Sequence, residues 1–82
     1  MKVRVFSTPV CPFCTMTKDF LNEHNIPFKD IDVTKDHEAA HEMIEKSGQM
    51  GVPVTIIEDK GKESVIIGFD QKKLKKALEI KE

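Results

Sequence analysis

The sequence predicts an α/β domain in which the elements follow the order β-α-β-α-β-β-α and build a mixed four-stranded sheet. Two observations predict this class. Apolar residues alternate in some segments and recur at helical spacing in others, and the two kinds of segment succeed one another along the chain. With 82 residues, the chain has the size of one small domain. We therefore expect residues 1–82 to form a single domain with helices on both faces of the sheet.

The first part of the chain predicts a strand, a helix and a second strand. In KVRVFS, residues 2–7, the two valines alternate with other residues, as in a strand. A helix is expected from Pro12 to about Asn25, because Pro27 cannot continue it. The side chains expected to face the core from this helix are Met16, Phe20 and Leu21. FKDIDV, residues 28–33, is the second strand, and the helix between the strands makes a parallel pair.

The second part predicts a helix, a hairpin and a last helix. A helix is expected from about Asp36 to Ser47, ended by Gly48. Its inward side chains should be Ala39, Ala40, Met43 and Ile44. PVTIIE, residues 53–58, and ESVIIG, residues 63–68, flank the polar turn DKGK, so these two strands should be antiparallel. The last helix should start after an N-cap at Asp70 and face inward with Leu74, Ala77 and Leu78.

Composition narrows the classes of partner. The formal net charge is −1, with 13 basic and 14 acidic residues, which provides no field to attract nucleic acid or an anionic membrane. No apolar run approaches the roughly 18 residues that span a bilayer. The first residues, MKVRVFS, contain no apolar region of a secretory signal. We therefore expect a cytoplasmic monomer without nucleic-acid or membrane partners.

The segment CPFC contains the only two cysteines of the chain. If Cys11 is the N-cap of the first helix, Pro12 takes the first helical position, where its missing N–H costs nothing. Amides at the helix start would then favour the thiolate of Cys11, and Cys14 would lie on the same helical face and be more covered. This arrangement predicts a redox pair in which Cys11 attacks a target disulfide and Cys14 resolves the mixed disulfide.

Other patterns allow other functions. HEAAH, residues 37–41, matches the zinc-protease pattern H-E-x-x-H, although no third ligand is evident. A zinc-binding structural or interaction domain is the main alternative, and its ligands would be Cys11, Cys14, His37 and His41. The residues between the two pairs, 15–36, are more than a zinc finger has and contain a complete strand pattern. An interaction domain without redox chemistry and an iron–sulfur protein are further alternatives, but we expect no bound metal.

With these motifs placed, the whole chain resembles a glutaredoxin and, more broadly, the thioredoxin-fold redoxins. CPFC differs from the usual dithiol motif Cys-Pro-Tyr-Cys only at Phe13, and GVPV lies where the fold has a cis-proline. The resemblance implies a cis bond between Val52 and Pro53, with the Val52 backbone pairing with an extended substrate or glutathione. The catalytic residues would be Cys11 and Cys14, and the substrate-binding residues Pro12, Phe13, Val52, Pro53, Gly68, Phe69 and Asp70.

The chain departs from the glutaredoxin pattern at two places. Thr8 stands where many glutaredoxins have a lysine, and IGFD is shorter than the usual run before the last helix. In these places the chain is similar to small redoxins that act like thioredoxin and are reduced by thioredoxin reductase. The expected partners are disulfide-containing proteins, with either glutathione or a flavoprotein disulfide reductase as electron donor. Glutathione would be a co-substrate, and we expect no bound cofactor.

Overall fold

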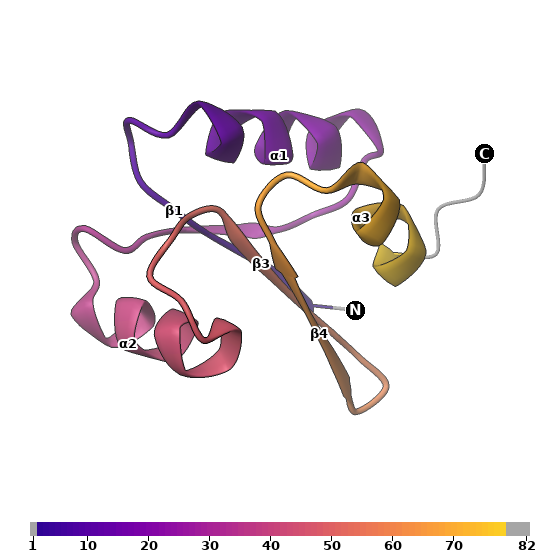
Figure 1. Ribbon diagram of the computed structural model, residues 1–82. Coiled ribbons are helices and arrows are strands. Elements are labelled where there is room, and N and C mark those ends of the chain that lie inside the picture. Colours follow the sequence, from indigo (N-terminus) through magenta and orange to yellow (C-terminus); the bar gives the residue numbers. More distant parts are fainter. Residues whose placement is uncertain (1, 79–82) are drawn as a thin grey trace.

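The computed structural model describes residues 2–78 and shows one four-stranded sheet with helices on both faces (Figure 1). The elements are β1 (Lys2–Ser7), α1 (Pro12–Glu23), β2 (Lys29–Asp32), α2 (His37–Ser47), β3 (Val54–Asp59), β4 (Lys62–Ile67) and α3 (Gln71–Leu78). The strand order is β2-β1-β3-β4. β1 is parallel to β2 and antiparallel to β3, and β3 is antiparallel to β4. The predicted element order and the mixed sheet are confirmed.

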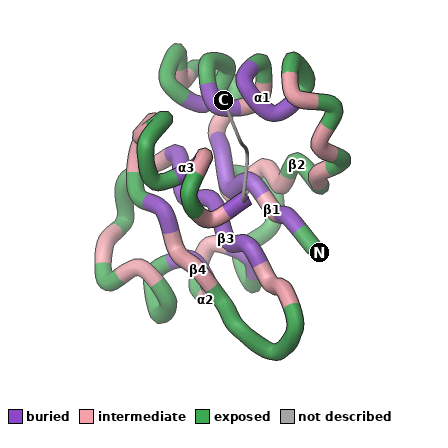
Figure 2. Tube along the Cα trace, turned by 90° about the vertical axis from the view of Figure 1, so that its right-hand side faces the viewer, coloured by how far each residue is buried: buried purple, intermediate pink, exposed green. Residues whose placement is uncertain are grey.

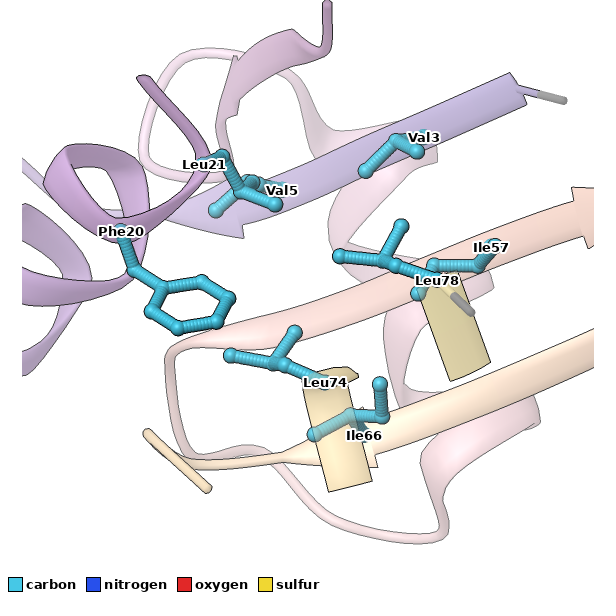
Figure 3. Packing of buried hydrophobic residues seen from close by; sticks show 8 residues of the cluster. All are labelled: Val3, Val5, Phe20, Leu21, Ile57, Ile66, Leu74 and Leu78. Carbon is cyan, nitrogen blue, oxygen red and sulfur yellow. The ribbon is translucent and has the colours of Figure 1, made fainter. Parts of the chain in front are cut away.

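A separate apolar cluster covers each face of the sheet. Helices α1 and α3 cover one face, where eight buried side chains pack together (Figure 3): Val3, Val5, Phe20, Leu21, Ile57, Ile66, Leu74 and Leu78. Helix α2 covers the other face, where the buried cluster is Phe6, Ala39, Met43, Val54 and Ile56. The division follows from the strand period, because successive residues of a strand point to opposite faces. Figure 2 shows the result, with burial concentrated along β1 and β3.

Two helical side chains that were expected to face inward are exposed instead. Met16 on α1 is 44% exposed and Ile44 on α2 is 36% exposed, while Ala40 is only half-buried. The buried stripes are narrower than the sequence suggested: α1 buries Cys14, Thr17, Phe20 and Leu21, and α2 buries Ala39 and Met43. Each helix contacts the sheet along one side, so apolar residues one position off that line lie at its edge.

The ends of the elements also differ from the expectation. Helix α1 ends at Glu23, and Asn25 takes a left-handed conformation with φ 56°, so that the Ile26 amide donates to Leu21 O at 2.9 Å. A left-handed turn, and not the proline at position 27, therefore ends the helix. The β3–β4 turn consists of Lys60 and Gly61 alone, both with positive φ, as in a type I′ hairpin. Both ends of β1, the start of α1, the end of α2 and the start of α3 lie where they were predicted, and the boundaries of β2, β3 and β4 and the start of α2 differ by one residue.

Within residues 2–78, none of the helices combines the length and the apolar character that crossing a membrane requires.

Candidate active site

The two cysteines lie at the start of α1. Cys11 is the N-cap, with extended backbone angles of φ −96° and ψ 111°, and Pro12 occupies the first helical position. The amide of Cys14 donates to the Cys11 sulfur at 3.2 Å. Before the helix, the Cys11 amide donates to Thr8 O at 3.4 Å and closes a tight turn. The strand β1 thus delivers the chain, through this turn, directly to a helix start that has sulfur as its cap.

The two thiols differ in their environments. Cys11 is half-buried, whereas Cys14 has an exposed fraction of 0%. Burial first, and then the hydrogen bond with the Cys11 side chain and its charge, raise the pKa of the Cys14 thiol from 9.0 to about 11. A backbone hydrogen bond from Thr8 and the charge of Lys18 lower the pKa of Cys14. At neutral pH, Cys14 is therefore held as a protonated thiol while Cys11 is accessible.

The loop before β3 completes the surroundings of Cys11. The peptide bond between Val52 and Pro53 is cis, as the sequence predicted. The Cys11 thiol donates to Val52 O at 3.9 Å, so the backbone of this loop contacts the sulfur directly. Pro53 is buried, and its carbonyl accepts the Gly68 amide at 2.8 Å. This hydrogen bond ties the cis-proline loop to the segment before α3.

The residues predicted to bind substrate fall into two groups. Pro12 is exposed, and Phe13, two residues after Cys11, is 57% exposed. Phe69, in contrast, is half-buried and packs edge-on against Phe20, with ring centroids 6.2 Å apart, at the border of the apolar core. Its contact with substrate stays a prediction.

Asp70 and Gly68 have backbone roles. The Asp70 carboxylate accepts the Lys73 amide at 3.1 Å and so caps α3, which confirms the predicted N-cap. Gly68 adopts a φ of 75°, which favours glycine at this turn. Substrate contacts of these two residues stay a prediction.

The comparisons with known proteins agree with this geometry. The model of the Glutaredoxin family matches residues 3–62, which include both cysteines and the cis-proline loop. The chain belongs to the glutaredoxin family.

Three relatives show how far the likeness extends. An uncharacterized glutaredoxin-like 8.6 kDa protein in the rubredoxin operon of Clostridium pasteurianum is 38% identical over 94% of this chain and 97% of its own. The crystal structure of the thioredoxin-like protein BC3987, mutant T8A, is 31% identical with a TM-score of 0.84, over 98% of this chain and 97% of that one. NrdH-redoxin from Escherichia coli, at 22% identity and a TM-score of 0.76 over 100% and 97%, shares the fold. This glutaredoxin-family chain therefore has the predicted thioredoxin-like fold.

The glutaredoxin fold keeps the residues of the alternative zinc site apart. Cys11 and Cys14 start α1, whereas His37 and His41 lie on α2, on the other face of the sheet (Figure 1). His41 contacts Glu45 one turn along its own helix, at 3.0 Å. Among residues 2–78, no three His, Cys, Asp or Glu side chains come together as a metal site would require. The structure thus does not support zinc chemistry through either histidine pattern.

The structure adds residues to the glutaredoxin site that the sequence analysis did not identify. Val10, 88% exposed, directly precedes Cys11 in the sequence, and Met50, 78% exposed, lies two residues before Val52. On the covered side of α1, Lys18 donates to Asp30 at 3.1 Å, and Asp30 accepts from Ser7 at 2.7 Å. Lys18 lies one helical turn after Cys14, but the sequence gives no signal for its contact with Asp30, which lies on β2.

Proposed function

We propose that this glutaredoxin-family chain is a thiol–disulfide oxidoreductase that reduces disulfides of protein substrates through Cys11 and Cys14. One observation carries the proposal: the two sulfurs share one helix start, yet Cys11 is accessible while Cys14 is buried and protonated. A nucleophile must be reached by its target, whereas a resolving thiol needs only to reach the nucleophile. The positions of the two cysteines fit these two roles.

The reaction transfers two electrons from the dithiol to the target. The Cys11 thiolate attacks one sulfur of the target disulfide, and the other target sulfur leaves as a thiolate that takes up a proton. Cys14 then loses its proton and attacks the Cys11 sulfur. The target is released as a second thiolate, which is protonated, and the Cys11–Cys14 disulfide forms. An external electron donor must then return two electrons and two protons to this disulfide.

The mixed disulfide itself prepares Cys14 for the second step. In the reduced protein with Cys11 ionised, both the hydrogen bond with Cys11 and the negative charge of its thiolate raise the pKa of Cys14. Once the Cys11 sulfur is bonded to the target, it carries no charge and accepts hydrogen bonds poorly, so both causes disappear. The pKa of Cys14 should therefore fall when, and only when, there is a mixed disulfide to resolve.

The surroundings of Cys11 suit a protein substrate. Phe13, Val10 and Met50 expose apolar surface, and each lies within two residues of Cys11 or of Val52, whose carbonyl contacts the Cys11 sulfur. Apolar side chains around a reactive group contribute binding without selecting a particular charge. We propose that the substrate is a polypeptide segment with a disulfide, and that glutathione, where it takes part, enters as co-substrate.

The electron donor is either glutathione or a flavoprotein disulfide reductase of the thioredoxin-reductase type. The names of the relatives include both glutaredoxin-like and thioredoxin-like proteins, so the two donors have to be tested against each other. The oxidised protein is incubated with NADPH and either glutathione plus glutathione reductase or thioredoxin reductase. The donor that restores free thiols, measured by thiol titration, is the electron donor that the protein uses.

The roles of the two sulfurs are tested by exchanging each for oxygen. Cys11→Ser should abolish NADPH-coupled reduction of a protein disulfide such as insulin. Cys14→Ser should keep the first attack and accumulate a mixed disulfide at Cys11, visible by mass spectrometry. Turnover by Cys11→Ser at the wild-type rate would refute the proposal, and so would a mixed disulfide found on Cys14 of the wild-type protein.

A further inference from the structure

Three polar side chains, Lys18, Asp30 and Ser7, form a hydrogen-bonded network beside α1. Lys18 follows Cys14 by one helical turn, so the two residues share a side of α1. The Lys18 Nζ donates to Asp30 Oδ2 at 3.1 Å, and the Ser7 Oγ donates to Asp30 Oδ1 at 2.7 Å. Ser7 is 3% exposed at the end of β1. These two hydrogen bonds thus connect α1, β2 and β1 at the end of the sheet where the cysteines lie.

These three side chains hold the ammonium group of Lys18 on the side of α1 that carries the buried Cys14. The side chain of Lys18 is only 27% exposed, although an unpaired lysine on a helix surface would extend into water. Its anchor, through Asp30, is Ser7, and the next residue is Thr8, whose backbone makes a hydrogen bond that acts on Cys14. The positive end of Lys18 is therefore fixed on the Cys14 side of the helix start.

Resting on the function proposed above, we propose that Lys18 is a positioning residue for the resolving step, where its fixed positive charge favours the Cys14 thiolate that attacks the mixed disulfide. Asp30 and Ser7 hold that charge in place. No bond to Lys18 forms or breaks, and the proton of Cys14 passes to the solvent or buffer.

The other groups that act on Cys14 have different effects. Burial and Cys11 raise its pKa, while the Thr8 backbone and Lys18 lower it. The influence of Cys11 ends in the mixed disulfide, which leaves burial opposed by Thr8 and Lys18. Asp30, on β2, is the acidic group paired with Lys18, and it partly offsets the lysine charge. At the resolving step, Lys18 is thus the charged side chain on the described part of the chain that acts directly in favour of the thiolate.

The two thiols can be followed separately with 2,2′-dipyridyl disulfide, a neutral reagent. Attack by Cys11 breaks the reagent disulfide and releases one thiopyridone, and attack by Cys14 on the Cys11 sulfur releases the second. Lys18→Gln should leave the first release unchanged and slow the second about twofold at neutral pH. A partly screened charge changes the thiolate fraction by about two- to fivefold, and the higher nucleophilicity of the more basic thiolate offsets part of this change.

Three further measurements separate a charge effect from a structural one. Lys18→Arg, which keeps the charge, should restore the second release. Lys76→Gln removes the same charge from an exposed position on α3 and should have no effect. The pH profile of the second release should move to higher pH in Lys18→Gln, and the variant should no longer be slower than wild type once Cys14 is ionised in both.

Equal second-release rates for wild type and Lys18→Gln at neutral pH would overturn the role of Lys18. A reduced rate with the same ratio at every pH would also overturn it, because that result indicates displacement of Cys14 and not a change in its ionisation. Failure of the proposed function itself is a different result, since the wild-type protein would then release only one thiopyridone.

Discussion

The starts of α1 and α2 have the same geometry and different chemistry. In α2, the N-cap Asp36 accepts the amide of Ala39 at 3.0 Å, and in α1 the N-cap Cys11 accepts the amide of Cys14 at 3.2 Å. In both helices, the residue whose amide is bound is buried against the sheet. The preferred N-cap residues carry oxygen or no side chain, so α2 has a strong cap where α1 has a sulfur.

This difference indicates that the cysteine pair gives α1 a weaker N-cap than α2 has. A carboxylate at position 11 would cap the helix well but could not exchange with a disulfide. A second thiol at position 14 fills the place that a small apolar residue, Ala39, fills in α2. The backbone provides the same start for both helices, and the function follows from which atoms occupy the cap and the buried position one turn later.

The largest effect is expected from Cys11→Ser, which gives α1 an oxygen cap like that of α2. Disulfide reductase turnover should fall to background, because serine does not exchange with disulfides at neutral pH. The reduced protein should nevertheless be as stable as wild type or more stable, by up to about 1 kcal/mol. Urea unfolding of both proteins under reducing conditions measures this difference.

The matched comparison is Cys14→Ser, which places a hydroxyl in an apolar environment and should lower stability. A large loss of stability in Cys11→Ser would contradict the argument that the sulfur is the weaker cap.

Much of the fold could be predicted because local signals agree with it. The alternation in residues 2–7 and the proline after Cys11 predicted a strand followed by a helix start, and both are confirmed. The prediction that Met16 and Ile44 face inward was wrong, because a helical wheel gives the apolar side of a helix but not the width of its contact with the sheet. That width depends on the neighbouring elements.

The part of the site that lies within the first turn of α1 could be predicted from the sequence. Cys11 and Cys14 are close in sequence, so their unequal exposure followed from the cap position. The contact between Lys18 and Asp30 joins α1 to β2, and its geometry depends on the register of the parallel strands, which the sequence does not specify. The packing of Phe69 on Phe20 brings together residues 49 positions apart, so the sequence could not show it, and the substrate contact of Phe69 stays a prediction.

The next effect concerns the pH dependence of the reduced protein. The pKa of Cys14 is about 11 in the fold, against 9.0 as its ordinary value. Because the pKa of Cys14 is higher in the folded than in the unfolded protein, the unfolded protein loses this proton first as the pH rises. The free energy of unfolding is therefore unaffected by the ionisation of Cys14 below about pH 9 and decreases as the pH rises toward 11. About 1.4 kcal/mol should be lost by pH 10.

Lysines also titrate in this range, so the measurement has to isolate Cys14. Urea unfolding at pH 8 and pH 10, with a thiol-free reductant, is compared between wild type and Cys14→Ala. The variant resembles the start of α2, where alanine fills the same position. It should lose less stability than wild type over this interval. Equal losses would mean that burial does not disfavour the Cys14 thiolate.

The smallest effect is expected at the start of α2, from Asp36→Ala. Removing the carboxylate leaves the Ala39 amide without its cap, which should lower stability by about 1 kcal/mol and the melting temperature by about 4–8 °C. Asp36→Ser is the control, because its hydroxyl can accept the same amide and should retain most of the stability. Disulfide exchange should be unchanged in both variants, since α2 lies on the face of the sheet away from α1. A slower exchange in Asp36→Ala at a temperature where it is fully folded would show that the two helix starts are coupled through the sheet, and the separation of stability from chemistry argued from their comparison would then fail.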